Sequence, residues 1–139
     1  MAIEWTPYLS VGNNVIDNQH KELFSRLNGL IDAMSDGHSE EELSAFIGFL
    51  GDYVVVHFRT EEDLMDRYSY AATTAHKAQH AALVNDFMLI KQQLETTGAS
   101  EPLAIAIEKR LSDWLINHIG RVDKLLGAFL KTATLKKAA

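Results

Sequence analysis

Apolar residues recur along most of the chain at intervals of three and four, which is the spacing of one face of an α-helix. In the first such stretch the intervals run 4, 3, 4, 3, 4 from Ile16 to Met34, with His20 counted among the apolar positions. Turn-forming residues separate this stretch from the ones that follow. The pattern predicts an irregular arm at about 1–15 and four helices at about 16–35, 40–68, 74–96 and 101–132.

Local sequence signals mark where these helices begin. Ser39 and Glu42 form the pattern of a capping box, in which each side chain accepts from a free N–H at the start of a helix. Thr73 or Thr74 can cap the third helix, and Ser100 precedes a proline that suits the first turn of the fourth. Connections of about four to nine residues favour antiparallel neighbours. We therefore predict an all-α, up-down-up-down antiparallel four-helix bundle.

The composition agrees with a single domain over residues 1–139. Hydrophobic residues make up 47% of the chain and only two residues are proline, which excludes a disordered chain and disfavours an all-β one. The net charge of −6, without a basic stripe, argues against a nucleic-acid partner. No stretch approaches the ~20 apolar residues of a membrane span, so we expect no membrane association and a cytoplasmic location.

Histidines stand at positions where the buried helix faces would otherwise be apolar. Five of the six histidines fall on these faces, and they come from all four predicted helices. A single buried histidine is usually just hydrogen-bonded, but five in one small core would need many separate partners. A metal centre satisfies one nitrogen from each ring at once. The five are His20, His57, His76, His80 and His118, and the sixth, His38, falls in a loop.

The spacing of these residues suits chelation of a metal ion. His76 and His80 lie one helical turn apart, so both point to the same spot. His57 stands four residues before Glu61, and His118 stands five before an aspartate. Because the chain has no cysteine, any metal must be held by nitrogen and oxygen. This donor set suits iron, manganese, zinc or copper better than magnesium or calcium.

Five imidazoles and two carboxylates are too many ligands for one tetrahedral or octahedral ion, so two ions fit better. If Glu61 and Asp123 both bridge the ions, they give four oxygen contacts, and a bridging solvent-derived oxygen gives two more. With five nitrogens these contacts fill eleven of the twelve positions of two six-coordinate ions. One position is left for reversible uptake of a small molecule.

His118 and Asp123 do not share one face of an ideal helix, because five residues turn through about 140°. We therefore expect a local π-bulge around Gly120, a wide turn of the kind that occurs at functional sites. Regular hydrogen bonding from each residue to the fourth one before it, throughout 118–123, would exclude this bulge.

The chain resembles the hemerythrin family, and within it the single-domain bacteriohemerythrins. The resemblance covers the chain almost from end to end, and all seven expected ligand positions hold the expected residue types. The matching segments are Trp5, Val11 to His20, His57 to Met65, His76 to His80, and Trp114 to Asp123.

The resemblance implies a non-heme di-iron centre with an oxo or hydroxo bridge, which binds dioxygen reversibly for carriage, storage or supply. The iron with fewer histidines would be the dioxygen site. The ligands implied are His76, His80 and His118 for one iron, His20 and His57 for the other, and Glu61 and Asp123 as bridges.

Apolar side chains near the ligands are expected to wall the dioxygen pocket. Leu115 precedes His118 by about one turn, so it flanks the metal plane. Further candidates, for which ordinary core is the stronger interpretation, are Leu23, Phe24, Phe58 and Ile119.

Polar residues beside the ligands allow weaker predictions. A helix face through residues 57 and 61 points Glu62 away by about 100°, so we expect it on a solvated face together with Asp63 and Asp66. Two interpretations stay open for Asp17 and Gln19: partners of the metal ligands, or ordinary polar residues of a first turn.

Other classes of function also remain open. A di-iron ferroxidase, peroxidase or nitric-oxide-handling protein could use the same free position, but the Glu-x-x-His pairs of ferritin-like enzymes are absent from this sequence, which favours a protein that is not an enzyme. A dioxygen sensor would need an output module, from which this domain could be detached, and iron storage would need a cage-forming oligomer. We expect dioxygen as the ligand, an oxygen-consuming enzyme as a conceivable partner, and a monomer or weak oligomer.

Overall fold

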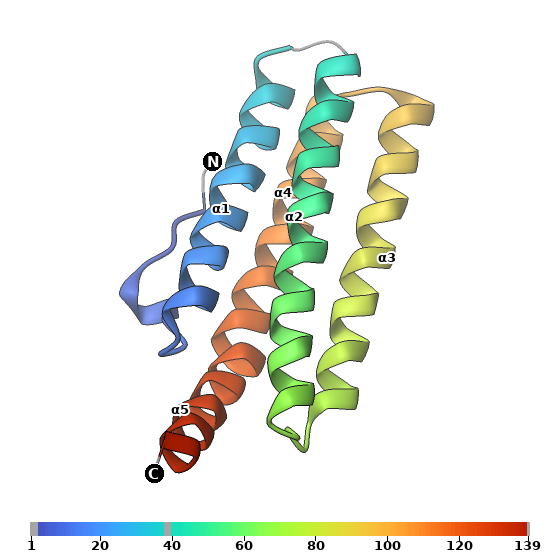
Figure 1. Ribbon diagram of the computed structural model, residues 1–139. Coiled ribbons are helices and arrows are strands. Elements are labelled where there is room, and N and C mark those ends of the chain that lie inside the picture. The colour runs from blue at the N-terminus through green and yellow to red at the C-terminus, as the bar shows by residue number, and fades with distance from the viewer. Residues whose placement is uncertain (1–2, 38–39, 139) are drawn as a thin grey trace.

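The computed structural model describes residues 3–37 and 40–138, and these form a four-helix bundle (Figure 1). Neighbouring helices run antiparallel, which confirms the all-α bundle predicted from the pattern. α4 and α5 are joined by one turn of different geometry and together make the fourth helix. The bounds are α1 Asn14–Ser35, α2 Glu40–Arg67, α3 Thr73–Thr97, α4 Glu101–Asn117 and α5 Lys124–Ala138.

The ends of the helices agree only in part with the local signals. Ser100 caps α4 as predicted, because its hydroxyl accepts from the backbone N–H three residues on. The prediction that Thr73 or its neighbour caps α3 is wrong: Ala72 precedes this helix without any side-chain cap, and the Thr73 hydroxyl donates to the carbonyl of the preceding turn. α5 continues beyond the end expected near 132. Ser39 and His38 lie outside the described residues.

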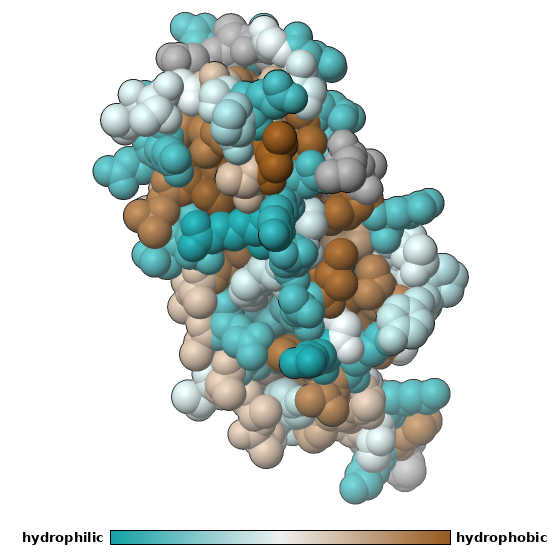
Figure 2. Space-filling view, turned by 180° about the vertical axis from the view of Figure 1, so that it is seen from behind, coloured by the Kyte–Doolittle hydropathy of each residue, from teal (hydrophilic) through white to brown (hydrophobic). Residues whose placement is uncertain are grey.

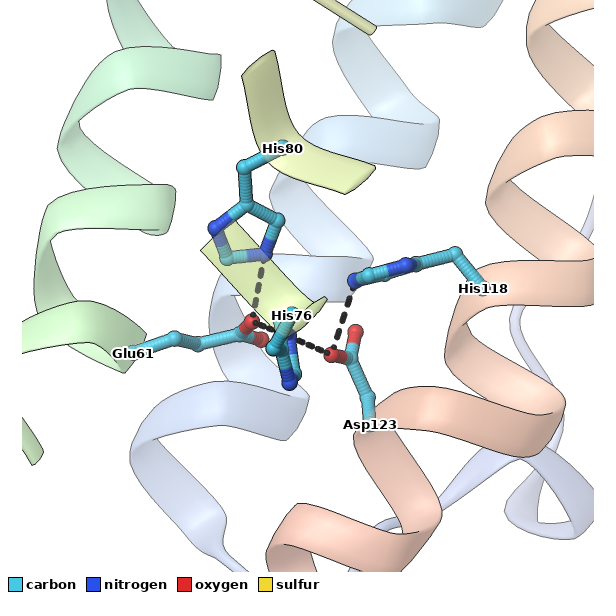
Figure 3. Close-up of side chains that lie close together, drawn as sticks. All are labelled: Glu61, His76, His80, His118 and Asp123. Carbon is cyan, nitrogen blue, oxygen red and sulfur yellow. Dashed lines mark hydrogen bonds and ion pairs between the residues drawn. The ribbon is translucent and has the colours of Figure 1, made fainter. Parts of the chain in front are cut away.

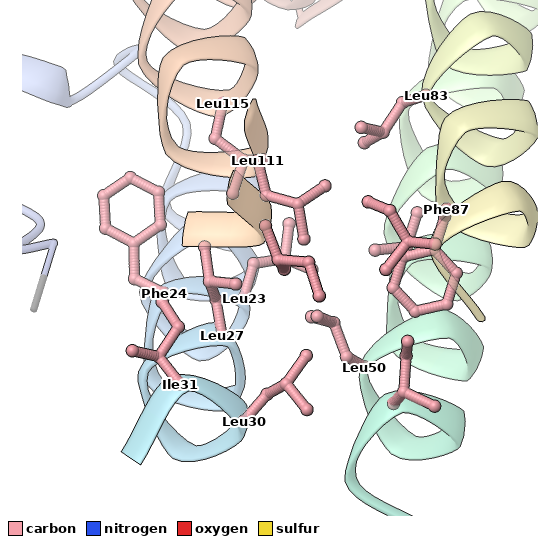
Figure 4. Close-up of a cluster of buried hydrophobic side chains, with 14 of the residues drawn as sticks. Leu23, Phe24, Leu27, Leu30, Ile31, Leu50, Leu83, Phe87, Leu111 and Leu115 are labelled. Atoms are coloured by element: carbon pink, nitrogen blue, oxygen red, sulfur yellow. The ribbon is translucent and has the colours of Figure 1, made fainter. Parts of the chain in front are cut away.

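Apolar side chains fill the bundle in two layers along the same helix faces. The larger layer, shown in Figure 4, lies where α1 to α4 pack together, and each fully buried leucine or phenylalanine in it contributes about 1.5–3 kcal/mol. A smaller layer lies nearer to α5. Buried members of the larger layer include Leu23, Leu27, Leu50, Leu83, Phe87 and Leu111, and those of the smaller layer Leu9, Val11, Ile16, Met65, Leu126 and Leu130.

The outer surface carries both apolar and polar side chains. On the face seen from behind, the two kinds alternate (Figure 2). Within the part of the chain that the structure describes, no helix is both long enough and apolar enough to cross a membrane.

The N-terminal arm packs against α1 and α5. The carboxylate of Asp17 accepts from the hydroxyl of Ser10 at 2.6 Å and from the backbone N–H of Val11 at 2.9 Å, which anchors the arm to the first turn of α1. The ammonium of Lys124 lies 4.1 Å from the ring centre of Tyr8. The arm therefore lies along the side of α1 and reaches the start of α5 (Figure 1).

Gly127→Ala is expected to destabilise the protein by about 1–3 kcal/mol, because the added methyl group would clash with the N-terminal arm where it packs on α5. A Cβ at this position would come within 1.9 Å of the carbonyl oxygen of Val11. Thermal unfolding measures the loss. Gly48→Ala is the control: a Cβ there would project into open space, so the alanine should stabilise α2 by about 0.5–1 kcal/mol. Equal stability of Gly127→Ala and the parent would contradict this packing of the arm.

Candidate metal centre

Seven ionisable side chains from all four helices of the bundle meet in its interior, between the two apolar layers. No more than 3% of the surface of any of them is exposed. Five are drawn in Figure 3, where two rings from α3 and one from the segment that follows α4 point towards two carboxylates. The structure thus brings together all the ligand candidates named from the sequence, which are His20, His57, Glu61, His76, His80, His118 and Asp123.

The turn between α4 and α5 allows two of these side chains to meet. Residues His118–Asp123 form a π-helical segment, in which the N–H of Lys124 donates to the carbonyl of Ile119, five residues before it. The wider turn places Nε2 of His118 3.0 Å from Oδ1 of Asp123. The π-bulge expected around Gly120 is confirmed.

Glu61 lies at the centre of the cluster and reaches four imidazoles. Its Oε1 lies 3.1 Å from Nε2 of both His76 and His80. Its Oε2 lies 3.0 Å from Nε2 of His57 and 3.5 Å from Nε2 of His20. One carboxylate therefore faces nitrogens from three helices.

Asp123 shares this central position. Its Oδ1 lies 3.0 Å from Nε2 of His76 and its Oδ2 lies 3.0 Å from Nε2 of His20. The ligand atoms form two overlapping groups, each within 4.8 Å, and both carboxylates belong to both groups. We call the group of Glu61, His76, His80, His118 and Asp123 the three-histidine position, and the group of His20, His57, Glu61 and Asp123 the two-histidine position.

Several atoms at this centre are buried without an aligned hydrogen-bond partner among the described residues. They include Nε2 of His20 and His118 and both carboxylate oxygens of Asp123. These atoms lie close together, but the angles between them are unsuitable for hydrogen bonds. Buried polar atoms are rarely left unpaired, and a cation between them would satisfy them all.

The protonation of His57 follows from a chain of hydrogen bonds that reaches the surface. The hydroxyl of Thr60 donates to the carbonyl of Val56 at 3.0 Å, so it accepts from the amide nitrogen of Gln19 at 3.1 Å. The oxygen of Gln19 therefore faces Nδ1 of His57 at 2.8 Å, and Nδ1 donates. Nε2 then faces the centre, 3.0 Å from a carboxylate oxygen of Glu61.

Two further histidines are held in the same way. Nδ1 of His118 lies 2.8 Å from the amide oxygen of Gln79, and Nδ1 of His80 lies 2.8 Å from a carboxylate oxygen of Glu62. A carboxylate can only accept, so Nδ1 of His80 carries a hydrogen, and its Nε2 faces inward, 3.1 Å from Oε1 of Glu61. Such outer partners fix the tautomer and orientation of ligating histidines.

These contacts settle the weaker predictions. Gln19 is a partner of a candidate ligand, whereas Asp17 anchors the arm instead. The expectation that Glu62 lies on a solvated face is wrong: its side chain is 31% exposed, but its flexible carbons let the carboxylate turn back to His80. Gln79 was missed, because its role depends on the neighbouring helix.

Aromatic rings cover two of the imidazoles. Phe58 stacks on His80 with ring centres 3.8 Å apart, and Trp114 stacks on His118 at 4.3 Å. The other residues expected near the dioxygen pocket, Leu23, Phe24, Leu115 and Ile119, are buried. Figure 4 shows three of these four among the apolar side chains of the larger layer.

The pKa values indicate how strongly this centre attracts positive charge. Burial by itself would lower the pKa of His20, but contacts with Asp123 and Glu61 raise it to about 9, and the same balance raises the pKa of His76 to about 9. Burial would raise the pKa of both carboxyls, yet the surrounding imidazoles hold that of Glu61 well below its usual value and lower that of Asp123 to about 2. Buried carboxylates of this kind require compensating cations.

Residues 11–130 match the family described as hemerythrin HHE cation binding domain. The chain belongs to the hemerythrin family. It is 38% identical to a bacteriohemerythrin of Methylococcus capsulatus, over 91% of this chain and 95% of that protein. It is 35% identical to a hemerythrin-like protein of Naegleria gruberi, over 86% of each. A crystal structure of wild-type hemerythrin matches with a TM-score of 0.82 and 32% identity, over 94% of this chain and 98% of that one.

The resemblance inferred from the sequence is thus confirmed, and the cluster can be judged as a metal site of a hemerythrin-family chain. Its ligand atoms are inward-facing imidazole nitrogens and carboxylate oxygens, with no thiolate in the chain. These are ligands for a transition-metal ion such as iron. The unpaired buried atoms and the two overlapping groups fit a pair of ions.

Proposed function

We propose that this chain binds dioxygen reversibly at two iron ions held by the buried cluster, for carriage, storage or supply of dioxygen. The observation that carries the proposal is the set of five inward-facing imidazole nitrogens around two shared carboxylates. When bound, iron supplies an open coordination position and the electrons that reversible dioxygen binding requires. The ligands would be His76, His80 and His118 for one ion, His20 and His57 for the other, and Glu61 and Asp123 for both.

The chain's own contribution is to hold the ligands rigidly and to exclude water. Gln19, Gln79 and Glu62 fix three imidazoles, and stacked rings limit their rotation. The apolar layers on either side of the cluster exclude water from it. This strengthens electrostatic interactions inside the cluster and limits side reactions of a bound ligand with solvent. No side chain is required to act as an acid or a base.

An iron assay combined with visible spectra tests the proposal. Purified protein should hold close to two iron ions per chain, and the reduced form should change colour in air and recover under dioxygen-free gas. A ratio near one ion per chain would contradict a dinuclear centre. Oxidation in air that gas exchange does not reverse, with two ions bound, would favour a di-iron enzyme instead.

Leu115→Ala is expected to retain both iron ions, but its dioxygen-bound form should oxidise irreversibly several-fold faster than that of the parent. Leu115 lies about one turn before His118 and is 5% exposed, so its removal would admit water beside the metal ligands. The decay of the dioxygen-bound spectrum measures this rate. Leu111→Ala is the matched control, because it opens a cavity one turn farther away at a similar cost of about 2–5 kcal/mol. Equal rates for both variants would show that Leu115 is ordinary core.

A further inference from the structure

We propose that Glu62 strengthens the first metal-binding step, at the three-histidine position, relative to the second. The inference rests on the proposed pair of ions. The third histidine already favours this position, and Glu62 adds to the difference between the two steps. Glu62 touches no metal ligand atom facing the centre, so it would act as a positioning residue through His80.

The outer partners of the histidines differ in charge but not in geometry. Nδ1 of His57 and of His118 each lie 2.8 Å from the neutral amide oxygen of a glutamine. Nδ1 of His80 lies at the same 2.8 Å from the carboxylate of Glu62. The Nδ1 atoms of His20 and His76 are buried without a hydrogen-bond partner among residues 3–37 and 40–138. Only one of the five imidazoles thus contacts an outer negative charge.

That charge acts on one position alone. His80 belongs to the three-histidine position and not to the two-histidine position. A hydrogen bond from an imidazole to a carboxylate is charge-assisted. It makes the other ring nitrogen more basic, so that this nitrogen is a stronger ligand for a metal ion. The other ring nitrogen of His80, which faces the centre, therefore binds a cation more tightly than its counterparts on His57 and His118.

The local surroundings leave the charge of Glu62 free to act. Lys77 lines the same surface groove, but its ammonium pairs with Asp66 at 3.1 Å. Among the described residues, the ion pair of Glu62 is with His80. Phe58 stacks on His80 at 3.8 Å with the ring planes 5° apart, which holds the imidazole in place from its face. A change at Glu62 should therefore alter charge without releasing the ring.

Zinc titration of the metal-free protein, followed by ¹⁵N NMR of the histidine rings, tests the order of binding. At one equivalent we expect the signals of His76, His80 and His118 to shift, and those of the other two ligands only with the second equivalent. E62Q keeps a hydrogen-bond acceptor for His80 but removes its charge. It should weaken the first binding step by roughly ten- to a hundred-fold and bring the two steps closer together.

The double variant E62Q/Q19E is the matched control, because it moves the charge to His57 and keeps the net charge of the parent. We expect it to bind zinc more tightly at the two-histidine position than E62Q does, so that the difference between the two steps becomes smaller still. Q79E adds a charge on the side that already has one and should preserve the original order. Melting curves of the metal-free variants report on folding separately from metal binding.

In E62Q, an unchanged affinity of the first step or equal weakening of both steps would overturn the inference. A parent protein that binds only one zinc ion would instead contradict the pair of ions in the proposed function. Simultaneous filling of both positions in the parent would leave the pair intact and refute the order. Loss of the order in E62A but not in E62Q would assign the effect to the hydrogen bond and refute the role of charge.

Discussion

Asp123→Ala is expected to lower the iron content from about two ions to one or fewer per chain. The Asp123 carboxylate lies 3.0 Å from Nε2 of His20, His76 and His118, so it belongs to both positions. Loss of a hydrogen-bonded outer partner typically costs ten- to a hundred-fold in metal affinity, and loss of a shared ligand should cost at least as much at each position. Iron analysis and zinc titration measure the change.

Two further variants show whether the effect is specific. Asp113→Ala removes an exposed acid from α4 and should leave both metal content and affinity unchanged. Asp123→Asn keeps the shape of the side chain but not its charge, and it should give an intermediate affinity. Asp123→Ala protein that holds two ions as firmly as the parent would show that this residue does not bridge them.

The bundle and its cluster could be predicted because helical periodicity is a local property. A residue on the face that packs into the core recurs every three or four positions, so a histidine at such a position stands out in the sequence. The turn around Gly120 could be predicted for the opposite reason. His118 and Asp123 violate the regular spacing, and a segment with hydrogen bonds over five residues is what brings them to one face.

Contacts that depend on side-chain reach or on neighbouring helices could not be predicted. The direction of the Cα–Cβ bond places Glu62 off the buried face, but its carboxylate is far enough from the backbone to return to His80. Gln79 bonds His118 from another helix, and nothing in either segment indicates that they lie opposite one another. The close approach of Val11 to Gly127 likewise joins segments far apart in the sequence.

The start of α3 shows a local signal that is present but not used. The Thr73 side chain has the chemistry of a helix cap. Its hydroxyl and its backbone N–H both bond the carbonyl of Tyr70, at 2.5 and 3.2 Å, because the short connection from α2 folds into a tight turn there. Competition between a cap and a turn of this kind is decided by the positions of the two helices, which the sequence of the loop does not contain.

Removing the metal ions is expected to lower the midpoint of thermal unfolding by about 10 °C or more. An ion present at a thousand times its dissociation constant stabilises the native state by about 4 kcal/mol, and for a chain of this size each kcal/mol shifts the midpoint by roughly 4 °C. Without an ion, buried atoms of His20, His118 and Asp123 have no aligned partner, and each such group typically costs about 1–3 kcal/mol.

Unfolding of the loaded protein with and without a chelator, after dialysis to remove released metal, measures this difference. Asp123→Ala supplies the control within the same experiment: because it should bind metal weakly, the chelator should shift its midpoint far less than that of the parent. The midpoint of its metal-free form should also be close to that of the metal-free parent or higher, since the variant lacks one of the two buried carboxylates that need a cation. Equal midpoints for the loaded and metal-free parent would mean that the seven side chains find their partners in one another, and the cluster would then be a structural network rather than a metal centre.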